Sequence, residues 1–248
     1  MKMRITPLCV LITILAWLPT VSALAGPGAA LAINGTNYVS ATVPTLVSNY
    51  TISAWVYLWQ GGDVSTRVGV FTGTNCGNSV ELMVHSGTSY TTDPQYLELG
   101  RCGAFNGTIS TNAVPINQWA HLAVAVTSNN EVNYYINGVA AGNVASSGNN
   151  LALGPGIHLG DNATRVFNGL LDEVQIWNRA LTQPEIQANM NHALTGAETN
   201  LVAYWQFNHA ATNTAALTGS AAICKARRPC GSKNCLVHYR IHETDERD

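Results

Sequence analysis

The stretch Phe167–Leu181, FNGLLDEVQIWNRAL, constrains the fold more than any other part of the chain. Its apolar residues occupy both strand parities, which is typical of a strand buried at the centre of a sheet. Asp172 and Glu173 interrupt it, and carboxylates in a buried strand need a partner. The apolar parity changes between Leu171 and Val174, as the extra residue of a β-bulge would require. The stretch therefore predicts a central strand with a charged irregularity, whose partner is a metal ion, backbone N–H groups or water.

Short alternating segments surround this strand and predict an all-β protein. Tyr50–Leu58 and Trp119–Thr127 alternate cleanly, and Glu131–Val139 ends in an Asn-Gly pair that favours a hairpin turn. Seven further segments between turn residues are strand candidates: Ala29–Ile33, Tyr38–Ala41, Arg67–Thr72, Ser79–His85, Gln95–Gly100, Ile157–Gly160 and Leu201–Phe207. The first two are expected to pair as a hairpin. The pattern predicts a two-sheet antiparallel jelly-roll sandwich, and Thr182-x-x-Glu185 predicts one short helix near the C-terminal end.

Composition divides the chain into three parts. Residues 1–25 carry an early positive charge, a short apolar segment and an A-x-A site, the pattern of a secretory signal peptide. Residues 26–210 form the β body, and no later segment is a candidate membrane span. Residues 211–248 are a linker and a basic, Cys-containing tail for which we expect disorder. The protein is therefore predicted to be secreted, whether extracellular, periplasmic or at the cell surface.

Charge and cysteine content narrow the function classes. The net charge is −2, so electrostatic capture of nucleic acid is not expected. Disulfides persist outside the cytosol, and Cys76 and Cys102 lie near the ends of neighbouring strand candidates, so a disulfide between them is predicted. The tail holds Cys224, Cys230 and Cys235, an odd number whose pairing stays open.

The sequence lacks a recognisable catalytic constellation. A glycan hydrolase needs two carboxylates on one face of a groove. Glu81 and Glu98 look isolated, and the adjacent Asp172 and Glu173 would point to opposite faces of a regular strand. His121 lies midway along an alternating strand, which favours a structural histidine. We therefore expect a non-catalytic protein.

Three segments together resemble a known family. The residues from Gly169 to Ile186 read G-x-L-D-E-V-x-I-W-N-R-A-L-T-x-x-E-I, which resembles the closing signature of laminin-G-like domains. The strand Tyr50–Leu58 and the later W-x-H-x-A-V and Y-x-I-N-G-V segments are similar to two further blocks of that family. The resemblance spans about Ala29 to Asn208 and implies a concanavalin A-like lectin/glucanase jelly roll.

Many sandwiches of this family hold calcium, which takes six to eight oxygen ligands. The resemblance implies a structural ion between the first hairpin and the central strand. The ligands it suggests are Asn34, the carbonyl of Gly35, Asn37 and Asp172; Asp161 and Asn162 form an alternative cluster. The other interpretation has Asp172 accepting backbone N–H groups at a bulge, and both stay open.

The resemblance favours a binding function but does not fix the ligand, because this fold hosts several functions. The first hypothesis is a secreted, non-catalytic module that binds a glycan or an extracellular protein through exposed aromatic residues. Trp59, Tyr90 and Tyr96 lie in or near predicted loops and are the candidates. The alternatives are a structural or adhesive spacer and, with less support, a glycan hydrolase.

Overall fold

The computed structural model describes residues 30–34, 38–59, 67–74, 80–86, 94–101, 104–145, 151–160, 167–207 and 222–224. Several predicted features lie outside the described residues: the signal peptide, Gly35, Asn37, Cys76, Tyr90, Cys102, Asp161 and Asn162. Within the described residues, no helix has the length and apolar character needed to cross a membrane.

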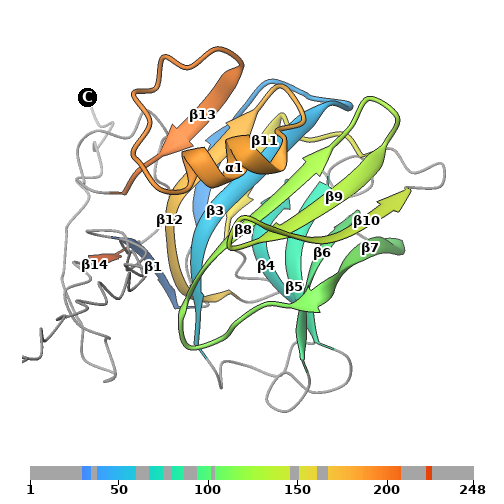
Figure 1. Ribbon diagram of the computed structural model, residues 1–248. Helices are drawn as coiled ribbons and strands as arrows, with labels where there is room; N and C mark the ends of the chain where they lie inside the picture. Colours follow the sequence, from blue (N-terminus) through green and yellow to red (C-terminus); the bar gives the residue numbers. More distant parts are fainter. Residues whose placement is uncertain are drawn as a thin grey trace, which may run out of the picture.

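The described residues form two antiparallel sheets (Figure 1). The eight-stranded sheet has the order β10-β9-β8-β3-β12-β1-β14, and β13 also pairs with β12. Its strands are β1 (Ala30–Asn34), β3 (Tyr50–Leu58), β8 (Trp119–Val126), β9 (Glu131–Ile136), β10 (Val139–Ala145), β12 (Asn168–Trp177), β13 (Leu201–Trp205) and β14 (Ala222–Cys224). The six-stranded sheet, of order β2-β11-β4-β5-β6-β7, contains β2 (Val39–Thr42), β4 (Arg67–Gly73), β5 (Val80–Ser86), β6 (Gln95–Arg101), β7 (Ala104–Ala113) and β11 (Gly156–Leu159). The predicted two-sheet jelly-roll sandwich is confirmed.

The main hydrophobic core lies between the two sheets. Alternate residues of β3 and β8 enter it, as their sequence pattern predicts: Ile52, Ala54, Val56 and Leu58 from one strand, and Leu122, Val124 and Val126 from the other. The intervening residues of these strands face outward. The outer face of the eight-stranded sheet therefore presents a second set of side chains, which includes every aromatic residue of β3 after Tyr50.

The predicted central strand is β12, which pairs with β3 on one side. Leu171 is opposite Val56 and Gln175 is opposite Ser53, so β12 has one residue more than β3 between these pairs. Glu173 has a φ of 50°, an uncommon conformation for a residue other than glycine. On the other side of β12, pairing passes from β1 to β13 across the same interval. The charged irregularity is thus a β-bulge at the point where β12 changes partner.

Three features differ from the sequence prediction. The strands β1 and β2 do not form a hairpin, because β1 joins the eight-stranded sheet and β2 pairs with β11 in the other. The strand β7 was not predicted, since it is rich in Asn, Ser and Thr and lies at a sheet edge, where polar residues are tolerated. The strand β14 falls within the predicted disordered tail and pairs with β1.

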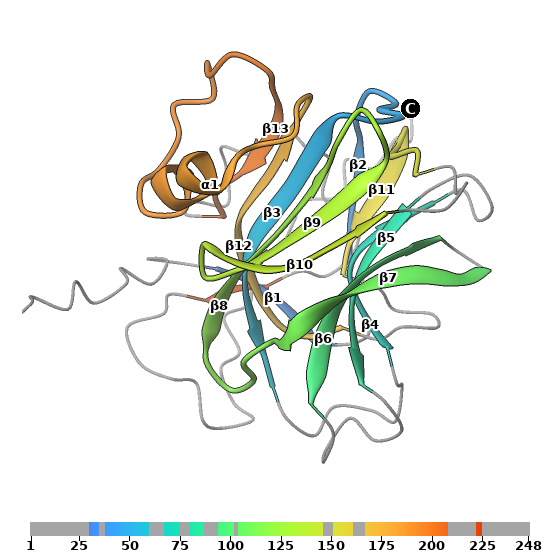
Figure 2. The ribbon, with the colours of Figure 1, turned by 45° about the vertical axis from the view of Figure 1, so that its right-hand side comes forward.

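The single described helix, α1 (Gln183–Asn189), covers part of the outer face of the eight-stranded sheet. Figure 2 shows it on the side away from the six-stranded sheet. Ile186 packs with Trp177, Leu181, Leu194 and Ala123 in a second, smaller core. One end of this outer face is therefore closed by α1 and the segments that flank it.

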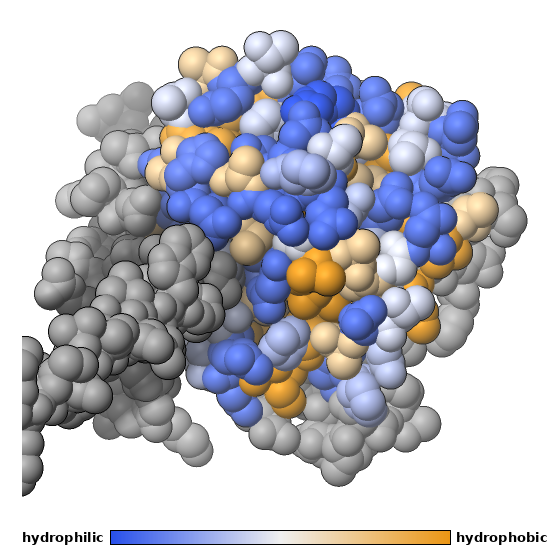
Figure 3. Space-filling view, viewed as in Figure 1, coloured by the Kyte–Doolittle hydropathy of each residue, from blue (hydrophilic) through white to orange (hydrophobic). Residues whose placement is uncertain are grey.

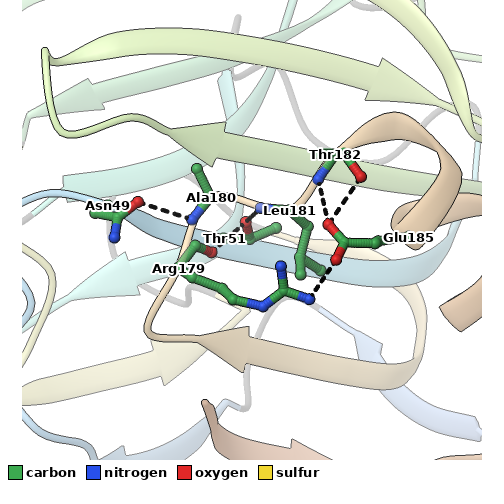
Figure 4. A network of polar contacts seen from close by, with 7 residues as sticks. All are labelled: Asn49, Thr51, Arg179, Ala180, Leu181, Thr182 and Glu185. Atoms are coloured by element: carbon green, nitrogen blue, oxygen red, sulfur yellow. Dashed lines mark hydrogen bonds and ion pairs between the residues drawn. The ribbon is translucent and has the colours of Figure 1, made fainter. Parts of the chain in front are cut away.

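Hydrogen bonds from side chains at and just before the start of β3 hold the segment before α1 (Figure 4). The Thr51 hydroxyl donates to the carbonyl of Arg179 at 2.9 Å and accepts from the N–H of Leu181 at 2.8 Å. The Asn49 side chain accepts from the N–H of Ala180 at 3.2 Å. Three consecutive backbone positions of the family signature are thus fixed by two side chains at the start of β3.

The polar residues of the signature also hold the start of α1. Glu185 accepts from Arg179 at 2.7 Å and from both the N–H and the hydroxyl of Thr182 at 2.8 Å. The bond from Arg179 is the largest cause that lowers the pKa of Glu185 to about 2. The carboxylate side of the predicted capping box is present. The charged residues at the end of the signature therefore have a structural role.

Candidate binding site

The register of the eight-stranded sheet arranges outward-facing side chains in rows that cross the strands. One row contains His121, Trp55 and Asp172 from β8, β3 and β12. The next row contains Trp119, Tyr57 and Leu170 from the same strands. The first row is buried, and the indole N–H of its Trp55 donates to the carbonyl of Met190. In the second row, Tyr57 and Trp119 are half-buried, so this row places aromatic residues where a ligand can approach.

Three half-buried aromatic residues, Tyr57, Trp59 and Trp119, form what we call the aromatic cluster. The ring centroids of Tyr57 and Trp59 are 6.3 Å apart, with 61° between the ring planes. Those of Tyr57 and Trp119 are 5.8 Å apart, with 76° between the planes. Both contacts are edge-to-face, an arrangement that aromatic pairs favour. The rings hold one another in place while part of each side chain remains exposed.

Amide side chains come from backbone segments that touch the aromatic cluster. The N–H of Trp59 donates to the carbonyl of Asn168 at 3.3 Å, and Asn168 itself is half-buried. The N–H of Asn117, an exposed residue two positions before Trp119, donates to the carbonyl of Leu58 at 2.8 Å. An amide group supplies both hydrogen-bond donors and an acceptor. The site thus combines apolar ring surface with neutral polar groups.

Gly169 allows β3 and β12 to approach closely beneath the aromatic cluster. A Cβ atom at this position would lie 2.1 Å from the carbonyl oxygen of Tyr57. That separation is far shorter than a van der Waals contact, so any larger residue would push the strands apart. The glycine that begins the family signature therefore helps to position Tyr57 and Trp59.

The sequence identified only one member of the aromatic cluster, Trp59. Tyr57 has the same strand parity as Trp59, a signal that was present in the alternation of β3. Trp119 is the first residue of β8, and only the pairing of β3 with β8 shows that it lies opposite Tyr57. The cluster therefore depends on register, which the sequence pattern did not supply.

The other predicted ligand contact within the described residues, Tyr96, lies elsewhere. It is on β6, where Leu97 and Leu99 enter the core, so its half-buried side chain is on the outer face of the six-stranded sheet. Trp59 and Tyr96 therefore face opposite sides of the sandwich. The structure does not combine them into one binding site.

His121 lies in the row next to the aromatic cluster and is 1% exposed. Its ring meets Trp55 edge-on at 5.4 Å, and the indole N–H of Trp55 donates to the carbonyl of Met190 at 3.1 Å. Burial lowers the pKa of His121 to about 3, so the imidazole is neutral at ordinary pH. Its Nδ1 atom has no hydrogen-bond partner. The buried ring is out of reach of solvent and is not placed as a catalytic base.

Asp172, in the same row, is fully buried. One carboxyl oxygen, Oδ1, accepts the N–H of Glu173 at 2.8 Å, whereas Oδ2 has no partner. Burial, with a smaller contribution from Glu173, raises the pKa of Asp172 to about 9. Glu173 in turn accepts a hydrogen bond from the hydroxyl of Tyr204. The arrangement matches the interpretation in which Asp172 bonds to the backbone at a bulge.

Of the predicted calcium ligands, Asn34 and Asp172 lie in described strands, whereas Gly35 and Asn37 lie outside the described residues. Asn34 is opposite Asn168, four residues before Asp172 in β12. Four residues of strand span about 13 Å, whereas ligands of one Ca²⁺ lie about 2.3–2.6 Å from the ion. In the described part of the chain, no three His, Cys, Asp or Glu side chains are grouped to hold a metal. The predicted calcium site stays a prediction, because Gly35 and Asn37 lie outside the described residues.

Glu81 and Glu98 are closer than the sequence suggested, which corrects their description as isolated. Glu81 is opposite Gly100 and Glu98 is opposite Met83, so the two acids are diagonal neighbours on the outer face of the six-stranded sheet. A Cβ atom at Gly100 would lie 3.3 Å from Oε1 of Glu98. Their exposures are only 2% and 3%. This burial separates them from solvent, unlike the groove that a glycan hydrolase requires.

The described surface carries few large exposed apolar residues. Val47, Ile109 and Val139 are the exposed large hydrophobic residues of the described segments, and they belong to different parts of the fold. On the face seen in Figure 3, hydrophobic areas are small and lie among hydrophilic ones. The half-buried aromatic cluster is therefore the more distinctive candidate for recognition.

Comparison with known proteins agrees with this architecture. The Laminin_G_3 family model, described as the concanavalin A-like lectin/glucanases superfamily, matches residues 34–187. A comparison with curated protein sequences gives no match.

Two solved structures share the fold at low sequence identity. A Bacteroides ovatus protein described as a candidate carbohydrate-binding protein aligns with a TM-score of 0.63 and 18% identity, over 82% of this chain. The chain spans 61% of the length of that protein. A heptameric SAP-like pentraxin from Limulus polyphemus aligns with a TM-score of 0.62 and 13% identity, over 81% of this chain and 96% of its own. At these identities the likeness shows the fold alone.

Proposed function

This chain belongs to the Laminin_G_3 family of concanavalin A-like lectin/glucanases, and we propose that it is a glycan-binding module whose site is the aromatic cluster. The fold supports a binding module in general, and the proposal places the ligand on the outer face of the eight-stranded sheet. The protein acts outside the cytosol in this proposal, as the signal-peptide pattern of residues 1–25 predicts.

The observation that carries the proposal is the pairing of exposed ring surface with amide groups. A sugar ring has apolar C–H faces and a rim of hydroxyl groups. Tyr57, Trp59 and Trp119 offer aromatic surface to the former, while the amide of the half-buried Asn168 offers donors and an acceptor to the latter. Binding sites commonly combine apolar lining with a few well-placed polar groups.

The proposal does not include catalysis. The buried carboxylates Glu81 and Glu98 lie on the other sheet, and His121 and Asp172 are buried beside the aromatic cluster. None of the four reaches a sugar that stacks on the cluster without a rearrangement of the sheet. If the glycan is attached to an extracellular protein, that protein is the partner in this proposal.

Alanine substitution of the cluster tests the proposal. The purified secreted protein is screened against a panel of immobilised glycans, and the affinity for each hit is measured by calorimetry. Trp59→Ala and Trp119→Ala are expected to weaken binding about 10- to 30-fold, because central aromatic contacts usually dominate binding energy. Tyr96→Ala, a half-buried aromatic residue on the opposite face, is the matched control and should leave the affinity unchanged.

The outcomes separate the hypotheses. Loss of binding in Tyr96→Ala with no effect of Trp59→Ala or Trp119→Ala would move the site to the six-stranded sheet and contradict the proposal. Failure of the wild type to bind any glycan in the panel would favour the structural spacer. Circular dichroism of each variant shows that a loss of binding is not a loss of fold.

A further inference from the structure

Building on the glycan-binding function proposed above, we propose that the ligand of the aromatic cluster is an uncharged, soluble glycan rather than an anionic one. Nothing in the fold requires this, since sandwich proteins can carry basic residues on either face. The inference comes from the charges that this chain places around the cluster and from the angles between its rings.

The sheet that carries the aromatic cluster provides no cation. None of the eight described strands, from β1 to β14 in the order given above, contains a lysine or an arginine. The described segment that leads into Trp119, residues 114–118, contains no charged residue either. Recognition of a carboxylate, sulfate or phosphate relies on Arg or Lys, which pair with the anion. An anionic sugar would therefore lose its hydration at this face without gaining a counter-charge.

The arginines within the described residues lie outside the strands that carry the aromatic cluster. Arg179 is bound to Glu185 at 2.7 Å beside α1. Arg67 and Arg101 are in β4 and β6 of the six-stranded sheet. Arg165, three residues before Asn168, lies outside the described residues, so it is included among the test variants.

The charged groups that do face outward on the eight-stranded sheet are acidic. Glu131 is exposed at the start of β9, and Glu173 is half-buried at the β12 bulge. His121 does not offset them, because burial lowers its pKa and keeps the ring neutral. Val132 pairs with Val126 at the end of β8 that is remote from Trp119, so Glu131 is far from the aromatic cluster and Glu173 is the nearer acid. The charge of Glu173 would oppose an anionic ligand, and this opposition weakens as salt screens it.

Ring geometry points to a flexible or curved chain of sugars. The planes of Tyr57 and Trp59 are inclined by 61°, and those of Tyr57 and Trp119 by 76°. A flat crystalline surface can stack only on rings that are nearly coplanar. Inclined rings instead suit a short epitope that contacts one ring by its face and the neighbours by their edges.

Matched pairs of oligosaccharides test the inference directly. Hexamers of glucose, galactose and mannose are compared with the corresponding uronic acid hexamers, which keep the ring stereochemistry and add one carboxylate per sugar. Affinity is measured by calorimetry at 20 mM and 300 mM NaCl for the full secreted chain and for Trp119→Ala. We expect at least one neutral hexamer to bind, its uronic acid counterpart to bind at least tenfold more weakly, and the neutral affinity to change less than twofold with salt.

Controls distinguish failure of this inference from failure of the proposed function. A uronic acid hexamer that binds as tightly as its neutral partner, loses affinity in Trp119→Ala and weakens with salt would overturn the inference while the aromatic cluster remains a glycan site. If Arg165→Gln abolishes binding of the uronic acid hexamer, Arg165 is the cation that pairs with the anionic glycan, and this result would also overturn the inference. Strong retention on microcrystalline cellulose that depends on Trp119 would contradict the soluble ligand. If no glycan binds in a Trp119-dependent way, the proposed function itself fails.

Discussion

Asp172 is the residue at which burial and ionisation conflict most clearly. Its carboxyl group is fully buried, and Oδ2 has no hydrogen-bond partner. Because burial raises the pKa of Asp172 from 3.8 to about 9, ionisation is easier in the unfolded chain than in the folded protein. The resulting destabilisation begins as pH rises above the unfolded pKa and grows until pH reaches about 9.

Asp172→Asn is therefore expected to stabilise the protein, because Asn keeps the oxygen that accepts the N–H of Glu173 and cannot ionise. The gain in the free energy of unfolding should exceed about 1 kcal/mol at pH 8 and be smaller at pH 5. Urea denaturation at both pH values measures it, with Glu131→Gln, an exposed acid on β9, as the control.

A calcium ion at Asp172 predicts the opposite result. Millimolar Ca²⁺ would then raise the thermal unfolding temperature of the wild type, since a ligand that binds only the folded state stabilises it. Asp172→Asn would lose that increase and unfold at a lower temperature than the wild type in the presence of the ion. This outcome would contradict the bulge interpretation.

The difference between Trp59 and Trp119 shows what the sequence can tell at the residue scale. Trp59 was identified as a candidate because it lies in or near a predicted loop. Strand alternation adds only that a side chain lies on one face of a sheet. It does not say which residues of two distant strands stand opposite each other. Trp119 joins the cluster only because β8 pairs with β3 in one particular register.

At the scale of elements, the signature residues just before α1 attach this helix to the eight-stranded sheet through hydrogen bonds. Thr51, on β3, makes two hydrogen bonds to the backbone of residues 179 and 181 while fully buried. The segment that Thr51 holds lies just before α1, more than a hundred residues later in the chain. The family signature therefore stabilises the face of the sheet on which the binding site lies, without belonging to that site.

Thr51→Val tests this role. The substitution keeps the shape of the side chain but leaves the N–H of Leu181 buried without its acceptor, which costs about 1–3 kcal/mol. Guanidinium denaturation should show that loss in the free energy of unfolding. Thr42→Val, an exposed threonine on β2, is the matched control. Equal free energies of unfolding for the two variants would mean that the hydrogen bonds of Thr51 contribute little to stability.

The elements that the sequence predicted well are those with a buried face. The strands β3, β8 and β12 alternate or are apolar on both faces because they contact the core. Thr182 precedes α1, and Glu185 lies in its first turn. The strand β7 escaped prediction because its described apolar side chain Ile109 is 44% exposed. The prediction of a hairpin between β1 and β2 was wrong, since the two strands belong to different sheets. The Asn34-Gly35 sequence favours a turn, but it does not require that the strands on either side pair with each other.

At the scale of the whole molecule, the two outer faces of the sandwich differ in chemistry. The eight-stranded sheet carries aromatic rings and amides at one end and the helix at the other. The six-stranded sheet carries two buried acids, Glu81 and Glu98, on its outer face. The fold fixes these faces, but the fold alone does not choose which of them binds a ligand. We base that choice on the half-buried rings of the aromatic cluster.

The indole N–H resonances of the tryptophans test the central claim most directly. Trp59 and Trp119 belong to the aromatic cluster, whereas Trp55, Trp177 and Trp205 are 3%, 3% and 4% exposed and serve as internal controls. On titration with a neutral glycan that binds, two-dimensional NMR of ¹⁵N-labelled protein should show the resonances of Trp59 and Trp119 shifting while the three buried ones stay in place. Saturable binding that leaves the resonances of Trp59 and Trp119 unchanged would contradict the account.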